Sequence, residues 1–337
     1  MANLLVTSRC NRNCSFCFAR KRLSRTRSDG DSRDMSRDSF NRFIDFLKRS
    51  DVHELRLLGG EPTLHPAFEE MVGQAIKEGF RVHVFTNGMM AGRTADFLAS
   101  YPCDRLSALC NISPQARDTE SLKQRREYAL AKLGSRVSLG ITVTSPDFEF
   151  EWLIDVIKRH GLKRRIRIGV AQPIVGEANE YLEPTQYRAV GKALTQMARR
   201  CVQEDILIGF DCGLTLCMFS EEEIGVLATC SEGFSCVCRP ILDIGPQLDV
   251  WHCFPLSEIL NTHLESFSTR SEILRHYEKI THPFRSLGCR PECIKCNYLR
   301  RGQCTGGCLA HAIKSLNRMP PRLAVEPARA AGEDNRH

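Results

Sequence analysis

The sequence predicts an α/β fold, in which a parallel sheet wound with helices is followed by a cysteine-rich C-terminal extension. Within residues 3–170, short runs rich in Leu, Val and Ile alternate six times with segments whose apolar residues recur every three or four positions. Such alternation is typical of parallel strands joined by right-handed crossovers. Eleven of the 17 cysteines fall within 212–308, which sets the extension apart. The periodicity fits an open sheet and a partial barrel equally.

The elements can be placed along the chain from this pattern. Strands are expected at 3–7, 54–58, 81–85, 106–112, 137–144 and 165–170, and apolar stripes of helical spacing lie at 40–47, 68–76 and 152–157. In parallel α/β sheets, ligands gather at the carboxyl ends of the strands. Cys10, Gly59 and Asn87 each follow one of the first three strands. The sequence therefore predicts that these three residues lie on the same rim.

Composition narrows the class of protein. The chain has 337 residues, a hydrophobic content of 42% and a net charge of +7, and no apolar run approaches the roughly 18 residues that a membrane helix needs. The start, MANLLVTSRC, lacks the basic and apolar regions of a signal peptide. We therefore expect a cytoplasmic protein whose cysteines bind metal or carry redox chemistry, rather than a secreted disulfide scaffold. Residues 319–337 are expected to be a disordered tail.

The first cysteine cluster has the spacing Cys-x3-Cys-x2-Cys, formed by Cys10, Cys14 and Cys17 in CNRNCSFCF. Three thiolates on one tight loop can hold three irons of a [4Fe–4S] cube and leave the fourth iron open. A zinc site without its fourth ligand and plain reduced thiols are the alternatives. Zinc sites more often combine two separated Cys-x2-Cys pairs, so the spacing favours iron.

This loop resembles the signature loop of the radical S-adenosylmethionine (SAM) enzymes. Two later elements strengthen the resemblance: LGGEP at 58–62 is similar to the family's GGEP element, which contacts the SAM amino group, and TNG at 86–88 is similar to its recurrent turn after strand three. The resemblance implies a partial (β/α)6 barrel over 1–205. It also implies a [4Fe–4S] cluster on the three cysteines, with SAM chelating the open iron.

The resemblance also implies the chemistry and the residues around SAM. One electron from the cluster splits the sulfonium and yields a 5′-deoxyadenosyl radical, which abstracts a substrate hydrogen, while the protein orients the reactants. A flavodoxin- or ferredoxin-type donor is the implied source of the electron. The implied SAM-binding residues are Gly59, Gly60, Glu61, Asn87 and Thr142, with Glu61 at the amino end. Asn87 and Thr142 are equally compatible with simple turn and strand roles.

The C-terminal cysteines form a second signal. Cys293, Cys296, Cys304 and Cys308 are spaced x2, x7 and x3, and the stretch 238–253 resembles the strand-turn-strand entry of the SPASM and Twitch extensions. The resemblance implies an auxiliary module over 206–318 with one or two further [4Fe–4S] clusters. The implied ligands are Cys230, Cys236, Cys238, Cys253, Cys289, Cys293, Cys296, Cys304 and Cys308.

The module also departs from the full SPASM pattern. That pattern has a further cysteine after the Cys-x3-Cys pair, and none follows Cys308. Cys289, Cys230 or Cys236 substitutes for it, or one cluster keeps an open site. A structural zinc is the alternative. Asp211, Cys212 and Cys217, in FDCGLTLCMF, also stay open: the thiols could be ligands, hydrogen donors or buried residues, and Asp211 a proton acceptor or a substrate contact.

Three functions follow as hypotheses. The first is modification of a peptide or protein side chain, with a separate peptide-recognition protein as a possible partner. The second is dehydrogenation or epimerisation of a small molecule, such as an aminoglycoside or cofactor precursor. The third is a non-catalytic iron–sulfur scaffold, which the GGEP element argues against. The basic run within 20–27 either steers an acidic substrate or is a solvated loop. No nucleic-acid module is visible, and neither a nucleic acid nor a membrane is expected as a partner.

Overall fold

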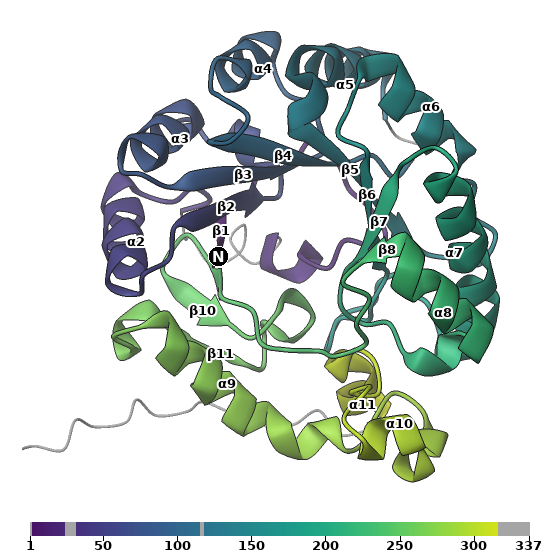
Figure 1. The fold of residues 1–337 in the computed structure, drawn as a ribbon. Coiled ribbons are helices and arrows are strands. Elements are labelled where there is room, and N and C mark those ends of the chain that lie inside the picture. Colours follow the sequence, from purple (N-terminus) through teal and green to yellow (C-terminus); the bar gives the residue numbers. More distant parts are fainter. Residues whose placement is uncertain (1, 24–31, 115–117, 316–337) are drawn as a thin grey trace, which may run out of the picture.

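A single curved sheet organises the chain. The computed structural model describes residues 2–23, 32–114 and 118–315, and the expected tail at 319–337 lies outside them. The sheet has the strand order β11-β10-β9-β1-β2-β3-β4-β5-β6-β7-β8. Its strands β1 to β8 curve into a ring, and helices cover the outer face of that ring (Figure 1). The partial barrel of parallel strands and helices is thereby confirmed.

The six predicted strands all form, each within one residue of its expected ends. They are β1 (Ala2–Thr7), β2 (Glu54–Gly59), β3 (Arg81–Thr86), β4 (Leu106–Asn111), β5 (Val137–Val143) and β6 (Arg165–Val170), and each pairs in parallel with the next. Two more parallel strands extend the sheet, β7 (Leu207–Phe210) and β8 (Ser231–Glu232). They are too short to give a periodic signal in the sequence.

The helices of the ring pack their apolar stripes against the outer face of the strands. They are α2 (Arg37–Arg49), α3 (Phe68–Lys77), α4 (Gly92–Ala99), α5 (Glu120–Leu133), α6 (Glu151–His160), α7 (Tyr187–Val202) and α8 (Glu221–Cys230). In α2, the Ser36 side chain accepts a hydrogen bond from Ser39 N and caps the helix, while Phe40, Phe43 and Ile44 are buried. The core therefore lies between the sheet and its helices.

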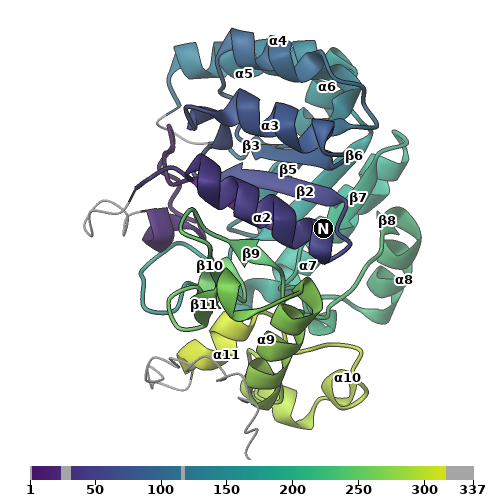
Figure 2. The ribbon, with the colours of Figure 1, turned by 90° about the vertical axis from the view of Figure 1, so that its left-hand side faces the viewer.

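The C-terminal elements return to the first strand. β9 (Asp243–Ile244) pairs in parallel with β1, and β10 (Asp249–Trp251) and β11 (Asn261–His263) follow in antiparallel order. The helices α9 (Arg270–Arg285), α10 (Asn297–Arg300) and α11 (Leu309–Ser315) gather on the same side of the molecule (Figure 2). The sheet thus runs across the expected division at residue 205, which itself stays a prediction.

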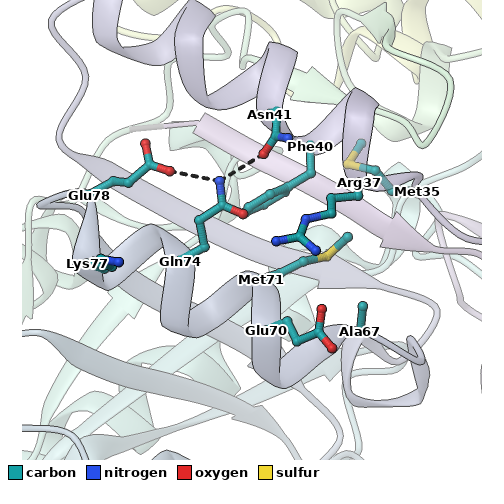
Figure 3. A pocket seen from close by; sticks show the side chains of 10 residues that line it. All are labelled: Met35, Arg37, Phe40, Asn41, Ala67, Glu70, Met71, Gln74, Lys77 and Glu78. Atoms are coloured by element: carbon teal, nitrogen blue, oxygen red, sulfur yellow. Dashed lines mark hydrogen bonds between the residues drawn. The ribbon is translucent and has the colours of Figure 1, made fainter.

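Among the described residues, no helix is both long enough and apolar enough to span a membrane. A groove of about 800 Å³ lies on the outside of the ring, between α2 and α3 (Figure 3). Gln74 crosses it and donates hydrogen bonds to Asn41 and Glu78, each at 2.8 Å. No cysteine is among the residues that line this groove.

Asp243, on β9, carries a carboxyl group that folding buries. Asn3 Nδ2 donates to Asp243 Oδ1 at 2.6 Å, and burial raises the pKa of this carboxyl from 3.8 to about 7. Between these two values the folded chain holds a proton that the unfolded chain has released. The free energy of unfolding therefore falls as the pH rises through this window, and it levels off above the folded pKa.

We expect Asp243→Asn to remove this pH dependence, because the amide keeps the size of the carboxyl without its charge. Above the window, the variant should be more stable than the wild type by up to about 4 kcal/mol. Chemical unfolding of both proteins at about pH 5 and about pH 8, at matched iron content, measures the difference. An equal loss of stability with rising pH in both proteins would contradict the assignment.

Candidate active site

Three thiols lie on the loop that follows β1. Cys17 N donates to Cys14 O at 3.2 Å, and Arg12 N lies 3.4 Å from the Cys10 sulfur, so the loop folds back on itself. Burial raises the pKa of Cys10 to about 12 and that of Cys17 to about 11, and the neighbouring thiols add to both shifts. These thiols are protonated in the metal-free chain, so binding iron must release their protons.

The donor set of the front loop is made of thiols alone, because no His, Asp or Glu lies between Cys10 and Cys17. Among the described residues, no three His, Cys, Asp or Glu side chains are gathered around one position that a metal ion would occupy. Cysteine thiolates are the usual ligands of a [4Fe–4S] cube. By its chemistry, the donor set of Cys10, Cys14 and Cys17, which we call the front thiols, is compatible with the cube that the sequence predicts.

The loop after β2 holds Glu61 in the interior, beside the front thiols. Its Oε1 accepts hydrogen bonds from the Thr63 and Thr86 hydroxyls, each at 2.7 Å, and its Oε2 accepts from Asn87 N at 2.7 Å. Burial raises the pKa of this carboxyl, and these hydrogen bonds oppose the shift. Glu61 thus joins the loops after β2 and β3, and its charge also acts on Cys10.

Gly60 lets this loop pass directly against the front loop. A Cβ at Gly60 would lie 2.3 Å from the Arg9 carbonyl oxygen and 2.8 Å from the Cys10 Cβ. At Gly59 it would lie 2.7 Å from the Thr7 carbonyl oxygen. Only glycine fits either position, and Glu61 N donates to Arg9 O at 2.7 Å across the contact. The two glycines thus fix the front loop against the end of β2.

The other two expected SAM contacts take different places. Asn87 Nδ2 donates to Asn11 Oδ1 at 2.7 Å, and Asn87 Oδ1 accepts from Met89 N, so this side chain ties the front loop to the turn after β3. Thr142 lies further along the rim on β5, where its backbone N donates to the Ser113 hydroxyl at 2.9 Å. The predicted rim therefore forms, with Cys10, Gly59 and Asn87 together on it.

Sequence reasoning missed the residue that anchors the front loop to the segment after β4. Arg12 forms a buried ion pair with Asp118 at 2.7 Å, each side chain being 5% exposed, and donates to Ser113 O at 2.7 Å. A further basic residue, Arg22, is also anchored: it pairs with Asp249, donates to Ser257 O and stacks on Trp251. A solvated loop is therefore the wrong interpretation for Arg22, while the segment 24–31 lies outside the described residues.

The charge interactions among the cysteines of the extension divide them into two groups, which sequence reasoning did not separate. The first, which we call the Cys253 set, consists of Cys212, Cys238, Cys253 and Cys308. Burial raises the pKa of Cys253 well above its usual range, and the other three thiols of the set add to the shift. Cys212 likewise interacts with Cys238 and Cys308. Cys238 and Cys253 flank the β9–β10 hairpin, as the predicted strand-turn-strand requires.

The second group, which we call the Cys289 set, consists of Cys217, Cys236, Cys289, Cys293 and Cys304. Burial raises the pKa of Cys289, and the thiols of Cys293, Cys217 and Cys304 add to the rise. Cys236 interacts with Cys304 and Cys217, and residues 236 and 304 also form a backbone bridge. The front thiols and these two sets bring together twelve of the 17 cysteines.

Two of the expected ligands are not among the thiols that these interactions join. Cys230 ends α8, where its sulfur lies 3.6 Å from the Thr229 hydroxyl, and Cys296 is half-buried between the segment Pro291–Lys295 and α10. Cys212 and Cys217 take part instead. They come from the loop after β7, which sequence spacing alone could not connect with residues some 90 positions later.

The Cys253 set and the Cys289 set, which together we call the rear sets, have surroundings that fit bound clusters. The Tyr187 hydroxyl, both ring nitrogens of His252 and the amide of Gln172 are buried without hydrogen-bond partners among the described residues. His252 directly precedes Cys253, and Gln172 contacts Gly213, which follows Cys212. Glycines also pack tightly here, since a Cβ at Gly288 would lie 2.6 Å from the Cys293 sulfur. Buried donors and a close backbone are typical of the second shell of iron–sulfur centres.

Asp211 reaches the same region from the end of β7. Arg167 Nε donates to Asp211 Oδ1 at 2.7 Å, and the Arg167 guanidinium stacks 5.0 Å from the centroid of Phe85. The Asp211 side chain is 37% exposed, and its charge acts on Cys212. An accessible carboxylate beside a thiol set can receive a proton or bind a substrate cation. Cys212, the other candidate catalytic residue, belongs instead to a set of four cysteines.

Comparisons with known proteins agree with this geometry. A family model described as the Radical SAM superfamily matches residues 4–128. A tungsten-containing aldehyde ferredoxin oxidoreductase cofactor-modifying protein from Pyrococcus furiosus is 30% identical over 122 residues, which are 35% of this chain and 33% of that protein. An S-adenosylmethionine-dependent nucleotide dehydratase from Selenomonas ruminantium is 34% identical over 89 residues, 26% of this chain and 30% of that protein. The chain spans about a third of the length of these relatives.

Solved structures match over more of the fold. The structure of native anSMEcpe with bound AdoMet superposes with a TM-score of 0.65 at 17% identity, covering 94% of this chain and 95% of that one. SuiB from Streptococcus suis, bound to S-adenosylmethionine, gives a TM-score of 0.64 at 15% identity, covering 93% and 73%. These likenesses extend through the extension and establish the fold.

Proposed function

We propose that the chain, whose residues 4–128 match the Radical SAM superfamily model, cleaves S-adenosylmethionine reductively and abstracts a hydrogen atom from its substrate. One observation carries this proposal: the front thiols lie on the loop after β1, directly against Gly60 and the buried Glu61. A scaffold without SAM chemistry would need no such cradle beside its thiols.

Each residue of the rim has a part in this proposal. Cys10, Cys14 and Cys17 would hold three irons of a [4Fe–4S] cluster, which supplies the electron that splits SAM when both are bound. Gly59 and Gly60 would let the backbone approach the amino acid end of SAM. Glu61 and Asn87 hold the surrounding loops together. Thr142, on β5, would contribute its hydroxyl.

The rear sets support two auxiliary [4Fe–4S] clusters. The four thiols of the Cys253 set match the four ligands of one cluster. The Cys289 set offers five thiols for a second, and Cys217 or Cys236 takes the place of the cysteine that the SPASM pattern has after Cys308. Cys212 is then a ligand rather than a hydrogen donor, which leaves Asp211 as the candidate catalytic residue.

We propose a peptide or protein side chain as the substrate. The fold is that of SuiB, whose structure has been determined with its precursor peptide SuiA, and of anSMEcpe, determined with bound peptides. The Asp211 carboxylate could take the proton released on oxidation. A small molecule is the second candidate, because the curated relatives are named for a nucleotide and for a cofactor. A flavodoxin- or ferredoxin-type protein would supply the electron, and a separate protein could present the peptide.

Formation of 5′-deoxyadenosine tests the proposed activity. The full chain, reconstituted with iron and sulfide without oxygen, is mixed with dithionite and SAM, and the nucleoside is measured by chromatography. We expect each protein molecule to cleave several molecules of SAM even when no substrate is added. Fully loaded protein that forms no 5′-deoxyadenosine would overturn the proposal in favour of a scaffold.

Iron content tests the auxiliary clusters separately. Three clusters correspond to about twelve irons per chain, and we expect Cys253→Ala to lose about four of them while the front cluster keeps its SAM-dependent signal. Cys103→Ala is the matched control, since Cys103 is an exposed cysteine outside all three groups. About four irons in the wild type, or an unchanged content in Cys253→Ala, would contradict the assignment.

A further inference from the structure

Tyr187, the first residue of α7, carries a buried hydroxyl that lacks a partner among the described residues. Its side chain is 1% exposed, and its oxygen has no hydrogen-bond donor or acceptor within reach. Leaving a buried hydroxyl unpaired costs about 1–3 kcal/mol. A phenylalanine would fill the same space without this cost, so the hydroxyl itself has a use that packing does not explain.

The segments next to Tyr187 carry cysteines of both rear sets. The start of α7 packs against the segment Leu216–Met218, which carries Cys217, and Arg188 donates to Met218 O at 3.0 Å. The Tyr187 ring also meets the His311 ring edge-on, with centroids 6.1 Å apart. His311 N donates to Cys308 O at 3.0 Å, so this contact leads to the Cys253 set.

Thiols of the two rear sets act on the Tyr187 hydroxyl. Burial raises the pKa of Tyr187 above its usual range, and the thiols of Cys289, Cys308 and Cys217 add to the rise. Two of these thiols belong to the Cys289 set and one to the Cys253 set. Thiols of both sets therefore lie close enough to Tyr187 for their charges to act on its hydroxyl.

Two other tyrosines, Tyr277 and Tyr181, have partners for their hydroxyls. The Tyr277 hydroxyl, also buried, donates to Val250 O at 2.7 Å. The Tyr181 hydroxyl, next to His311, accepts from Lys314 Nζ at 2.8 Å. The unpaired hydroxyl is therefore a feature of Tyr187, at the boundary between the two thiol sets.

We propose that the Tyr187 hydroxyl donates a hydrogen bond to sulfur of the cluster held by the Cys289 set, on the side that faces the Cys253 set. The inference rests on the auxiliary clusters of the proposed function. A hydrogen bond to cluster sulfur stabilises the reduced, more negative form and raises the reduction potential. Tyr187 is then a positioning residue that sets how readily electrons pass between the two auxiliary clusters.

Tyr187→Phe tests this role in the reconstituted full chain, because it removes the oxygen and keeps the ring against His311. Redox titration followed by electron paramagnetic resonance (EPR) measures the midpoint potential of each cluster, and iron content and the unfolding temperature show that the variant is loaded and folded. We expect one auxiliary potential to shift to a more negative value at unchanged iron content. Tyr277→Phe is the matched control and should shift none, because its hydroxyl already donates to a carbonyl.

The outcomes of these experiments distinguish a failure of the Tyr187 hydrogen bond from a failure of the auxiliary clusters or of SAM cleavage. Unchanged potentials in fully loaded Tyr187→Phe would overturn the hydrogen bond alone, and so would an equal shift in Tyr277→Phe. A wild-type iron content of about four would overturn the inference together with the auxiliary clusters. If the wild type does not cleave SAM but Tyr187→Phe still shows the shifted potential, the proposed activity is overturned and the assignment of Tyr187 stands.

Discussion

Replacing Cys14 with alanine is expected to lower the formation of 5′-deoxyadenosine from SAM by at least about a hundredfold. Changing an outer-shell partner of a metal ligand already costs about 10–100-fold, and Cys14 is itself one of three proposed ligands. The loop offers no replacement thiol, since the front thiols are the cysteines of residues 2–23. Chromatography of the nucleoside, after anaerobic reconstitution, measures the loss.

Cys103→Ala controls for the removal of a thiol elsewhere in the chain and should retain full cleavage. The auxiliary clusters are expected to persist in Cys14→Ala, so its iron content should fall by about four and not to zero. Cleavage of SAM at the wild-type rate in fully folded Cys14→Ala would refute the role given to the front thiols.

Gly60→Ala should have an effect of similar size by a different route. The added Cβ would lie 2.3 Å from the Arg9 carbonyl oxygen and 2.8 Å from the Cys10 Cβ. The backbone of Arg9 cannot move aside as a flexible side chain could. We therefore expect the substitution to lower the free energy of unfolding by about 3 kcal/mol or more and to push the front loop away from the end of β2. The variant should lose about four irons and its SAM cleavage together.

Gly225→Ala is the matched control, because a Cβ there meets no atom within 4 Å and the residue lies in α8. It should bind SAM normally and be slightly more stable, since alanine favours helix over glycine. Iron analysis and the unfolding temperature of both variants measure the contrast. A Gly60→Ala protein with full iron and normal cleavage would show that the close approach is not needed.

The fold could be predicted from the sequence where strands are long enough to show their period. All six long parallel strands were predicted, and the order of Cys10, Gly59 and Asn87 after them predicted one rim. β7 and β8 escaped notice because runs of four and two residues carry no periodicity. The return of β9 to β1 depends on pairing over more than 200 positions, which local patterns do not encode.

The sequence predicted that cysteines are the ligands of the candidate site. It did not predict which cysteines lie together in one set. Regular spacing marked Cys293, Cys304 and Cys308 as ligands, yet Cys308 interacts with Cys238. Cys293 and Cys304 interact instead with Cys289. Cys212 and Cys217 lie close in sequence and join different sets. Such a partition follows from how the loop after β7 meets the C-terminal turns, and it is a property of the tertiary fold.

The central claim is that the front thiols hold a cluster with an iron open to SAM, and EPR of the reduced protein tests it most directly. Spectra of dithionite-reduced wild type are recorded with and without SAM, beside those of Cys14→Ala. We predict that SAM changes the signal of one cluster in the wild type and of none in the variant. A wild-type spectrum that SAM leaves unchanged, with about twelve irons bound, would contradict the claim.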